Sequence, residues 1–96
     1  MPQAQGTVVH NESANQFELQ LPGGLAVLQY RRTPDGMDLI HTKVPGKHEG
    51  AGHGTSLVTA AIEHARRSKQ RIIPTCPFVK AHFEKHPEDR EVALTP

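Results

Sequence analysis

Hydrophobic and polar residues alternate through the first half of the chain, which predicts three β-strands. Within Asn15–Leu21 every second residue from Phe17 onward is apolar, and this period of two is typical of a half-buried strand. Leu25–Arg32 and Met37–Val44 have the same character, with apolar residues on both faces at several positions. We therefore expect three consecutive strands before residue 45.

Two segments with strong turn chemistry connect these strands, Pro22–Gly24 and Thr33–Gly36. In the second of them Pro34 presets its φ near −65°, and Gly36 is free to adopt positive φ. Strands joined by connections this short pair side by side and run in opposite directions. The first half therefore predicts an antiparallel meander.

The hydrophobic period changes near Thr55, which predicts a helix that continues through Ala65. Five apolar residues recur there at helical spacing: Leu57, Val58, Ala61, Ile62 and Ala65. Arg66, Arg67 and Lys69 follow at the end where the helix dipole is negative. This placement favours helix termination over a nucleic-acid patch.

The last third of the chain predicts a short strand and a second helix. Arg71–Cys76 is a brief apolar run, and Pro77 suits the first turn of a helix Pro77–His86 that Pro87 ends. The apolar side of this helix carries Phe78, Val79, His82 and Phe83. The order predicts an α+β fold in which the last strand pairs in parallel with the third through a βαβ crossover. Such a crossover brings the segment after the third strand and Cys76 to the same edge of the sheet.

Composition and charge narrow the class of protein. The chain has 96 residues, 35% of them hydrophobic, and a mean hydropathy of −0.54, which predicts one soluble domain over 1–96 with a modest core. We expect the ends, 1–8 and 91–96, to be frayed. The formal charge of +1 gives no global field for nucleic acid or anionic lipid, so we expect neither partner.

The sequence also indicates a compartment. No apolar run approaches the roughly 20 residues of a membrane span. The start, MPQAQGTVVHNE, has neither the basic nor the apolar region of a signal peptide. The single cysteine, Cys76, excludes an internal disulfide and fits a reducing compartment. We expect a cytoplasmic protein.

Glycines stand at alternate positions directly before the predicted helix, at Gly50, Gly52 and Gly54. One glycine would serve a turn with positive φ, whereas three indicate a backbone that lies bare against a ligand. A dinucleotide fingerprint starting at Gly50 needs glycine where Thr55 stands, and the Gly-Lys-Ser/Thr end of a P-loop does not occur. The pattern therefore favours a cradle for a diphosphate, built without a metal from amide N–H groups and the helix N-terminus.

The segment Glu49–Gly54 resembles the Q/R-x-x-G-x-G/A loop with which GNAT-superfamily acetyltransferases hold the pyrophosphate of acetyl coenzyme A. The resemblance covers most of the chain from Asn15 to Pro87. The stretch Ile72–Pro87 is similar to the small single-domain branch of N-acetyltransferases, and its Pro-x-Cys-Pro-Phe-Val segment, Pro74–Val79, is the most specific part of the resemblance. It implies a minimal GNAT-like fold with the last strands splayed around the cofactor, acetyl-CoA as donor, an amine as acceptor, no metal and a possible homodimer.

The resemblance also implies a set of residues that contact coenzyme A: Val44, Lys47, Gly50, Ala51, Gly52, His53, Gly54, Thr55 and Phe78. Two positions depart from the family pattern. The loop begins with Glu49 in place of Gln or Arg, and Lys47 is expected to offset this charge. Lys43 stands where members of the branch often carry Glu. The N-terminal helices that wall the acceptor site in larger GNAT enzymes are also missing, which leaves the acceptor side open or completed by a partner.

Cys76 and His41 are the candidate catalytic residues. The N-terminus of the helix that starts at Pro77 is expected to lower the pKa of the Cys76 thiol. The thiol would act as a wall or proton donor in direct transfer, the favoured route, or as a nucleophile that carries the acetyl group. Alternatively Cys76 packs as a small apolar residue. A backbone N–H near Val44 would polarise the thioester carbonyl. His41 is a base if its side chain reaches the cleft, and alternation alone does not choose its face.

Two other functions compete with catalysis by these residues. Cys76, His82 and His86 have spacings that allow three zinc ligands, although a fourth is missing. The pair His48-Glu49 is followed by His53 one residue too late for the H-E-x-x-H motif of metalloproteases. The stronger rival is a module that binds coenzyme A or an acyl-CoA without transferring the acyl group.

Overall fold

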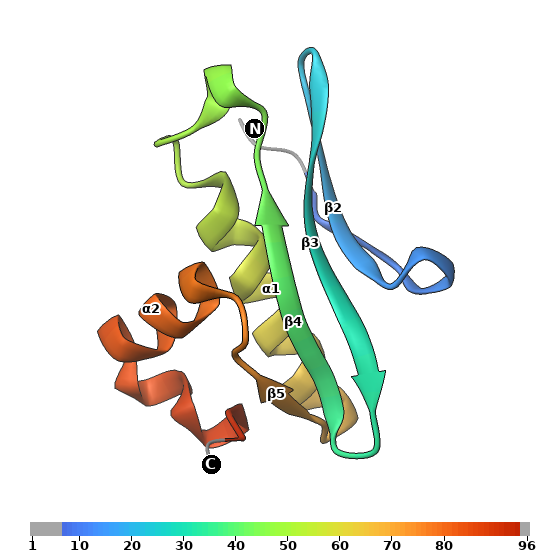
Figure 1. Ribbon diagram of the computed structural model, residues 1–96, viewed down its shortest axis with the longest axis vertical. Helices are drawn as coiled ribbons and strands as arrows, with labels where there is room; N and C mark the ends of the chain where they lie inside the picture. Colours follow the sequence, from blue (N-terminus) through green and yellow to red (C-terminus); the bar gives the residue numbers. More distant parts are fainter. Residues whose placement is uncertain (1–6, 95–96) are drawn as a thin grey trace.

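In the computed structural model, which describes residues 7–94, five strands form one sheet in the order β1-β2-β3-β4-β5 (Figure 1). The strands are β1 (Val9–Asn11), β2 (Gln16–Leu21), β3 (Gly24–Thr33), β4 (Gly36–Lys43) and β5 (Arg71–Ile73). The helices are α1 (His53–Ser68) and α2 (Pro77–Lys85), and three short 3-10 segments are η1 (Glu12–Ala14), η2 (Gly46–His48) and η3 (Pro87–Val92).

The strand pairing confirms the predicted meander and crossover. Strands β1 to β4 pair antiparallel in sequence order, and β5 pairs with β4 in parallel. The strand β1 was not predicted, because its three residues are too few to show an alternation. Residues 1–6 and 95–96 of the predicted frayed ends lie outside the described part of the chain.

Helix α1 packs on one face of the sheet and supplies much of the core. In Figure 1 it lies behind β4, while α2 lies beside the β5 edge. All five residues of the predicted stripe are buried: Leu57, Val58, Ala61, Ile62 and Ala65. They meet the apolar face of β2 and β3, where Phe17, Leu19 and Leu28 are almost fully buried. Burial of each large apolar side chain contributes about 1.5–3 kcal/mol, so this layer holds α1 in place.

A β-bulge in β4 decides which side chains face α1. Tyr30 pairs with Leu39 and Gln29 pairs with His41, which leaves Ile40 as the extra residue. A bulge of this kind resets the alternation of the strand. Beyond it, His41 lies on the exposed face beside Gln29, and Thr42 lies on the face of α1.

Strands β4 and β5 separate after the pair Asp38–Ile73. The predicted strand Arg71–Cys76 therefore ends earlier than expected, because Pro74 has no N–H to continue the ladder. Cys76 still donates its backbone N–H to the carbonyl of Leu39 at 2.8 Å. The chain then turns into α2 instead of following β4, so the two strands splay as the resemblance implied.

The C-terminal segment is packed against the sheet and α1. Val92 and Ala93, which fall in the segment expected to be frayed, are only 6% and 8% exposed. The backbone N–H of Leu94 also bonds the carbonyl of Ile72 at 2.7 Å. Arg66 anchors this segment through Asp89 at 2.9 Å and Glu91 at 2.5 Å. This basic residue therefore has a structural role at the end of α1.

Within residues 7–94, neither helix is long and apolar enough to cross a membrane.

Candidate active site

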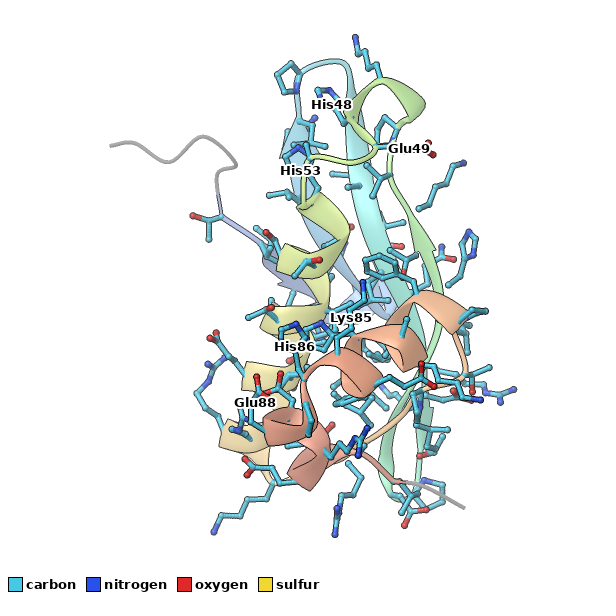
Figure 2. The ribbon with its side chains drawn as sticks, turned by 90° about the vertical axis from the view of Figure 1, so that its left-hand side faces the viewer. His48, Glu49, His53, Lys85, His86 and Glu88 are labelled. Atoms are coloured by element: carbon cyan, nitrogen blue, oxygen red, sulfur yellow. The ribbon has the colours of Figure 1, made fainter. Side chains whose placement is uncertain are left out.

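A pocket of about 490 Å³ lies where the end of β4, the glycine loop, the first turn of α1 and the start of α2 meet. Its lining residues are Thr42, Val44, His48, Glu49, Gly50, Gly52, His53, Gly54, Thr55 and Phe78. Figure 2 shows His48, Glu49 and His53 gathered at the loop, above α2 and the first turn of α1. The start of α2, directly after Cys76, thus meets the loop Glu49–Gly54 at one edge of the sheet, as the βαβ crossover predicted.

Most of the residues expected to contact coenzyme A line this pocket, and two do not. Val44 comes from the chain just after β4, Thr55 from α1 and Phe78 from α2. Lys47 points elsewhere, because its amino group would lie 2.7 Å from a Cβ added to Gly23 in the β2–β3 turn. Ala51 is also outside the lining set, although both of its neighbours belong to it.

The backbone N–H groups of the loop that lines the pocket, from Gly50 to Gly54, have no hydrogen-bond partner among the described residues. Gly50 and Gly52 have φ of +85° and +88°, a conformation that glycine adopts without steric cost. Gly52 is the N-cap of α1, and no side chain caps the helix. The backbone N–H groups of residues 50–55 donate no hydrogen bond to any described residue. The first N–H group that does is that of Ser56, which donates to the carbonyl of Gly52. The N-terminus of α1 therefore offers a cluster of free donors at its positive end.

Gly54 serves a different purpose from the other two glycines. It is a helical residue without positive φ, and a Cβ there would lie 2.8 Å from Cζ of Phe78. The absence of a side chain lets the Phe78 ring rest directly on the first turn of α1. Phe78 was predicted on the apolar side of its helix, yet it is 44% exposed because it lines the pocket instead of the core.

His48 and His53 hold the loop Glu49–Gly54 at its two ends. The Nε2–H of His48 donates to the carbonyl of Pro22 at 2.8 Å, which ties η2 to the β2–β3 turn. The ring of His53 lies edge-on to that of His48, with 5.8 Å between centroids. His53 is only 8% exposed, and its Nδ1 has no hydrogen-bond partner among the described residues. The sequence prediction missed His48, and the only available signal was its place in the loop.

These features fit a phosphate-bearing ligand. Free amides at a helix N-terminus provide donors beside the pocket, and the buried Nδ1 of His53 has no hydrogen-bond partner among the described residues. A Cβ added at Gly50 or Gly52 would meet nothing within 4 Å, so the space beside both glycines is open. Glu49 also lines the pocket, but it is exposed, and its carboxylate can turn toward water.

Cys76 lies next to this pocket, at the N-cap of α2. Its Sγ is 3.4 Å from the hydroxyl of Thr42, which lines the pocket on the β4 side. Burial raises the pKa of the thiol, but the hydroxyl of Thr42 and the amides of Phe78, Val79 and Thr42 stabilise the thiolate and lower its pKa overall. The predicted direction of this pKa shift is the one found. Cys76 is only 5% exposed, so this thiol combines burial in the core with a lowered pKa.

The structure does not bring His41 to Cys76. The bulge at Ile40 turns the imidazole to the exposed face, beside Gln29, while Thr42 and Cys76 lie on the other face. His41 is also absent from the residues that line the pocket.

The zinc set suggested by sequence spacing is not assembled. Cys76 is at the start of α2, whereas the rings of His82 and His86 stack at its end with 4.5 Å between centroids. His82 bonds Asp89 and His86 bonds Glu88, each at 3.1 Å. The histidines are thus engaged with carboxylates far along the helix from the cysteine.

Comparison with known proteins assigns this chain to a family. Residues 16–92 match the family model of the GCN5-related N-acetyltransferases. The chain belongs to this family of acyltransferase enzymes.

A solved structure has the same architecture along almost the whole chain. It is the solution structure of a GCN5-like candidate N-acetyltransferase from Staphylococcus aureus, with 28% sequence identity and a TM-score of 0.67. The match covers 98% of this chain and 93% of that protein. Both chains are thus minimal versions of the same fold.

Proposed function

We propose that this protein transfers an acetyl group from acetyl-CoA to an amine. The observation that carries the proposal is the cluster of unpaired amides at residues 50–55, which opens onto a pocket beside the Cys76–Thr42 pair. Membership of the N-acetyltransferase family gives the class of reaction.

The donor would bind by its diphosphate to the amides of Gly52–Thr55 and by its pantetheine arm to the edge of β4. That edge has no β5 partner beyond Leu39, since β5 ends at Ile73 and the chain turns away through Cys76. Thr42 and Val44 lie on this side of β4 and line the pocket. The thioester would then lie near the Thr42 hydroxyl, with a backbone N–H near Val44 polarising its carbonyl.

Cys76 is the residue best suited to act on the thioester. Because its pKa is lowered, a larger share of the thiol is ionised near neutral pH than for a free cysteine. The lowered pKa favours a two-step route over the direct transfer that the sequence analysis favoured. The thiolate attacks the carbonyl carbon, a bond forms between Sγ and this carbon, and the bond from the carbon to the sulfur of coenzyme A breaks. Coenzyme A leaves as a thiolate that takes up a proton. The amine then attacks the acetyl-cysteine, a C–N bond forms, and the Cys76 thiolate is released as the amine loses a proton to solvent.

Direct transfer is the alternative to this two-step route. In that case the amine attacks acetyl-CoA itself, and the Cys76 thiol only gives a proton to the departing coenzyme A thiolate. The variant Cys76→Ala distinguishes the two. The two-step route predicts loss of transfer with unchanged affinity for coenzyme A, and retained turnover would establish direct transfer.

The test of the function is kinetic. Release of free coenzyme A from acetyl-CoA should accelerate when a panel of primary amines is supplied, and the acetylated amine should appear in equal amount by mass spectrometry. If coenzyme A binds and no amine accelerates its release, the protein is a coenzyme A binding module and the proposed transfer is wrong.

A further inference from the structure

Two grooves lead away from the glycine loop, and both begin at Thr55. One runs along the outer side of α1, with a volume of about 390 Å³, and its charged residue is Glu63. The other, of about 140 Å³, lies between α1 and α2, and its charged or ionisable residues are His82, Lys85 and His86. The second groove also shares Phe78 with the main pocket.

We propose that the groove between α1 and α2 holds the phosphorylated adenosine of coenzyme A, with Lys85 binding its 3′-phosphate. This inference rests on the proposed function, because it assumes that the diphosphate lies on the amides of residues 50–55. Coenzyme A carries two arms on that diphosphate. Since the pantetheine arm must lead toward Cys76, the adenosine arm must leave the loop by another path.

The charges in the two grooves favour the groove between α1 and α2 for the adenosine arm. A ribose phosphate is repelled by Glu63 in the outer groove and attracted by Lys85 in the inner one. Lys85 takes part in none of the ion pairs formed among residues 7–94. Its ammonium group is therefore available to an incoming anion. Figure 2 shows Lys85, at the end of α2, and His86, directly after it, where the chain passes in front of α1.

The acidic residues at the far end of this groove are already engaged. Asp89 accepts hydrogen bonds from Arg66 at 2.9 Å and from His82 at 3.1 Å, so its charge is compensated. Glu88 bonds His86 at 3.1 Å and is 68% exposed at its side chain, which places it in water. Both carboxylates are on η3, beyond the end of α2, and neither lines the groove.

The groove also offers an apolar surface for a base. Phe78 lines the groove and is 44% exposed, and Ala81, which also lines it, lies one turn further along α2. An exposed aromatic ring next to a free cation is a combination that recognises phosphorylated nucleosides, because the ring stacks on the base and the cation meets the phosphate.

The experiment compares coenzyme A with dephospho-coenzyme A, which lacks only the 3′-phosphate. Dissociation constants are measured by isothermal titration calorimetry for the wild type, Lys85→Gln and the matched control Lys80→Gln, whose exposed lysine lies on α2 outside this groove. The wild type and Lys80→Gln should bind coenzyme A about fivefold more tightly than dephospho-coenzyme A, as expected for one exposed ion pair. Lys85→Gln should bind the two ligands equally, with the affinity of the wild type for dephospho-coenzyme A.

Two results would overturn the inference while leaving the proposed function intact. They are equal binding of both ligands by the wild type, and a preference for coenzyme A that survives in Lys85→Gln. A wild type that binds neither ligand at millimolar concentration would overturn the proposed function as well. The affinity of Lys85→Gln for dephospho-coenzyme A serves as the check that the variant is folded.

Discussion

Thr75 donates a hydrogen bond from its hydroxyl to Oδ1 of Asp38 at 2.5 Å, and this contact joins β4 to the chain just before Cys76. The other carboxylate oxygen of Asp38 accepts from Arg31 at 3.1 Å. Asp38 is 5% exposed and forms the last β4–β5 pair with Ile73. The contact therefore fixes the point at which the two strands separate, and with it the position of Cys76.

We predict that Thr75→Val lowers the free energy of unfolding by about 1–3 kcal/mol, because it leaves a buried carboxylate oxygen without a donor. Urea unfolding measures the change. Thr59→Val, at an exposed position of α1, is the matched control and should change stability by no more than about 0.5 kcal/mol. Equal stability of the two variants would show that the Thr75–Asp38 contact does not hold the strands.

The pKa of Cys76 should rise when the Thr42 hydroxyl is removed. That hydroxyl is the largest of the contacts that lower the thiol pKa, and without it burial has a greater effect. A pH titration of thiolate absorbance near 240 nm in Thr42→Val should therefore show a midpoint above that of the wild type. Thr59→Val should leave the midpoint in place, and an unchanged midpoint in Thr42→Val would contradict the assigned role of Thr42.

The glycines of the loop should differ in what they tolerate. Gly52→Ala forces a side chain into φ of +88°, which costs about 1–2 kcal/mol, and adds a Cβ where the diphosphate would lie. We expect lower stability by urea unfolding and at least tenfold weaker binding of coenzyme A by calorimetry. Gly46→Ala is the control, since its Cβ would meet nothing within 4 Å and its φ is not positive. If Gly52→Ala binds coenzyme A as well as Gly46→Ala does, the loop does not hold the phosphates.

The elements with a strong period were predictable from the sequence. The stripe of α1 from Leu57 to Ala65 and the alternation from Phe17 to Leu21 both appear at the expected positions. The turn residues around Gly36 predicted the antiparallel pairing of β3 with β4, and the βαβ crossover predicted the parallel pairing of β5 with β4. These features depend on local hydrophobic pattern and on topology, which the order of residues contains.

Other features depend on tertiary contacts that no local pattern contains. The bulge at Ile40 arises from the pairing of β3 and β4, so the face of His41 could not be chosen from alternation. Phe78 has helical apolar spacing, yet its ring packs on Gly54 because two helix starts meet at the pocket. Val92 and Ala93 follow a polar segment, and their burial comes with long-range contacts such as the Arg66–Asp89 ion pair.

The pH dependence of stability should involve Asp89. Burial raises the pKa of this carboxyl, but its hydrogen bonds to Arg66 and His82 lower it overall. A carboxyl with a depressed pKa stabilises the fold above the unfolded value of about 3.9, and that contribution is lost as the pH falls through the folded pKa. We predict that Asp89→Asn lowers Tm by a few degrees at pH 7, with a smaller further drop below pH 4 than the wild type shows.

Asp35→Asn is the control for this prediction, because Asp35 is exposed in the β3–β4 turn and belongs to no ion pair among the described residues. Asp35→Asn should have the Tm of the wild type at pH 7 and should show the same fall in Tm below pH 4. A Tm profile of Asp89→Asn that overlays the profile of Asp35→Asn would contradict a stabilising role for the Arg66–Asp89–His82 cluster.

The central claim is that backbone amides at the start of α1 bind the diphosphate of coenzyme A. Titration of ¹⁵N-labelled protein with coenzyme A, followed by amide chemical shifts, tests it most directly. The largest shifts should fall on Gly50, Gly52, His53, Gly54 and Thr55, and inorganic pyrophosphate should move the same amides in the same direction. Binding of coenzyme A that leaves these amides in place and shifts other residues would contradict the claim.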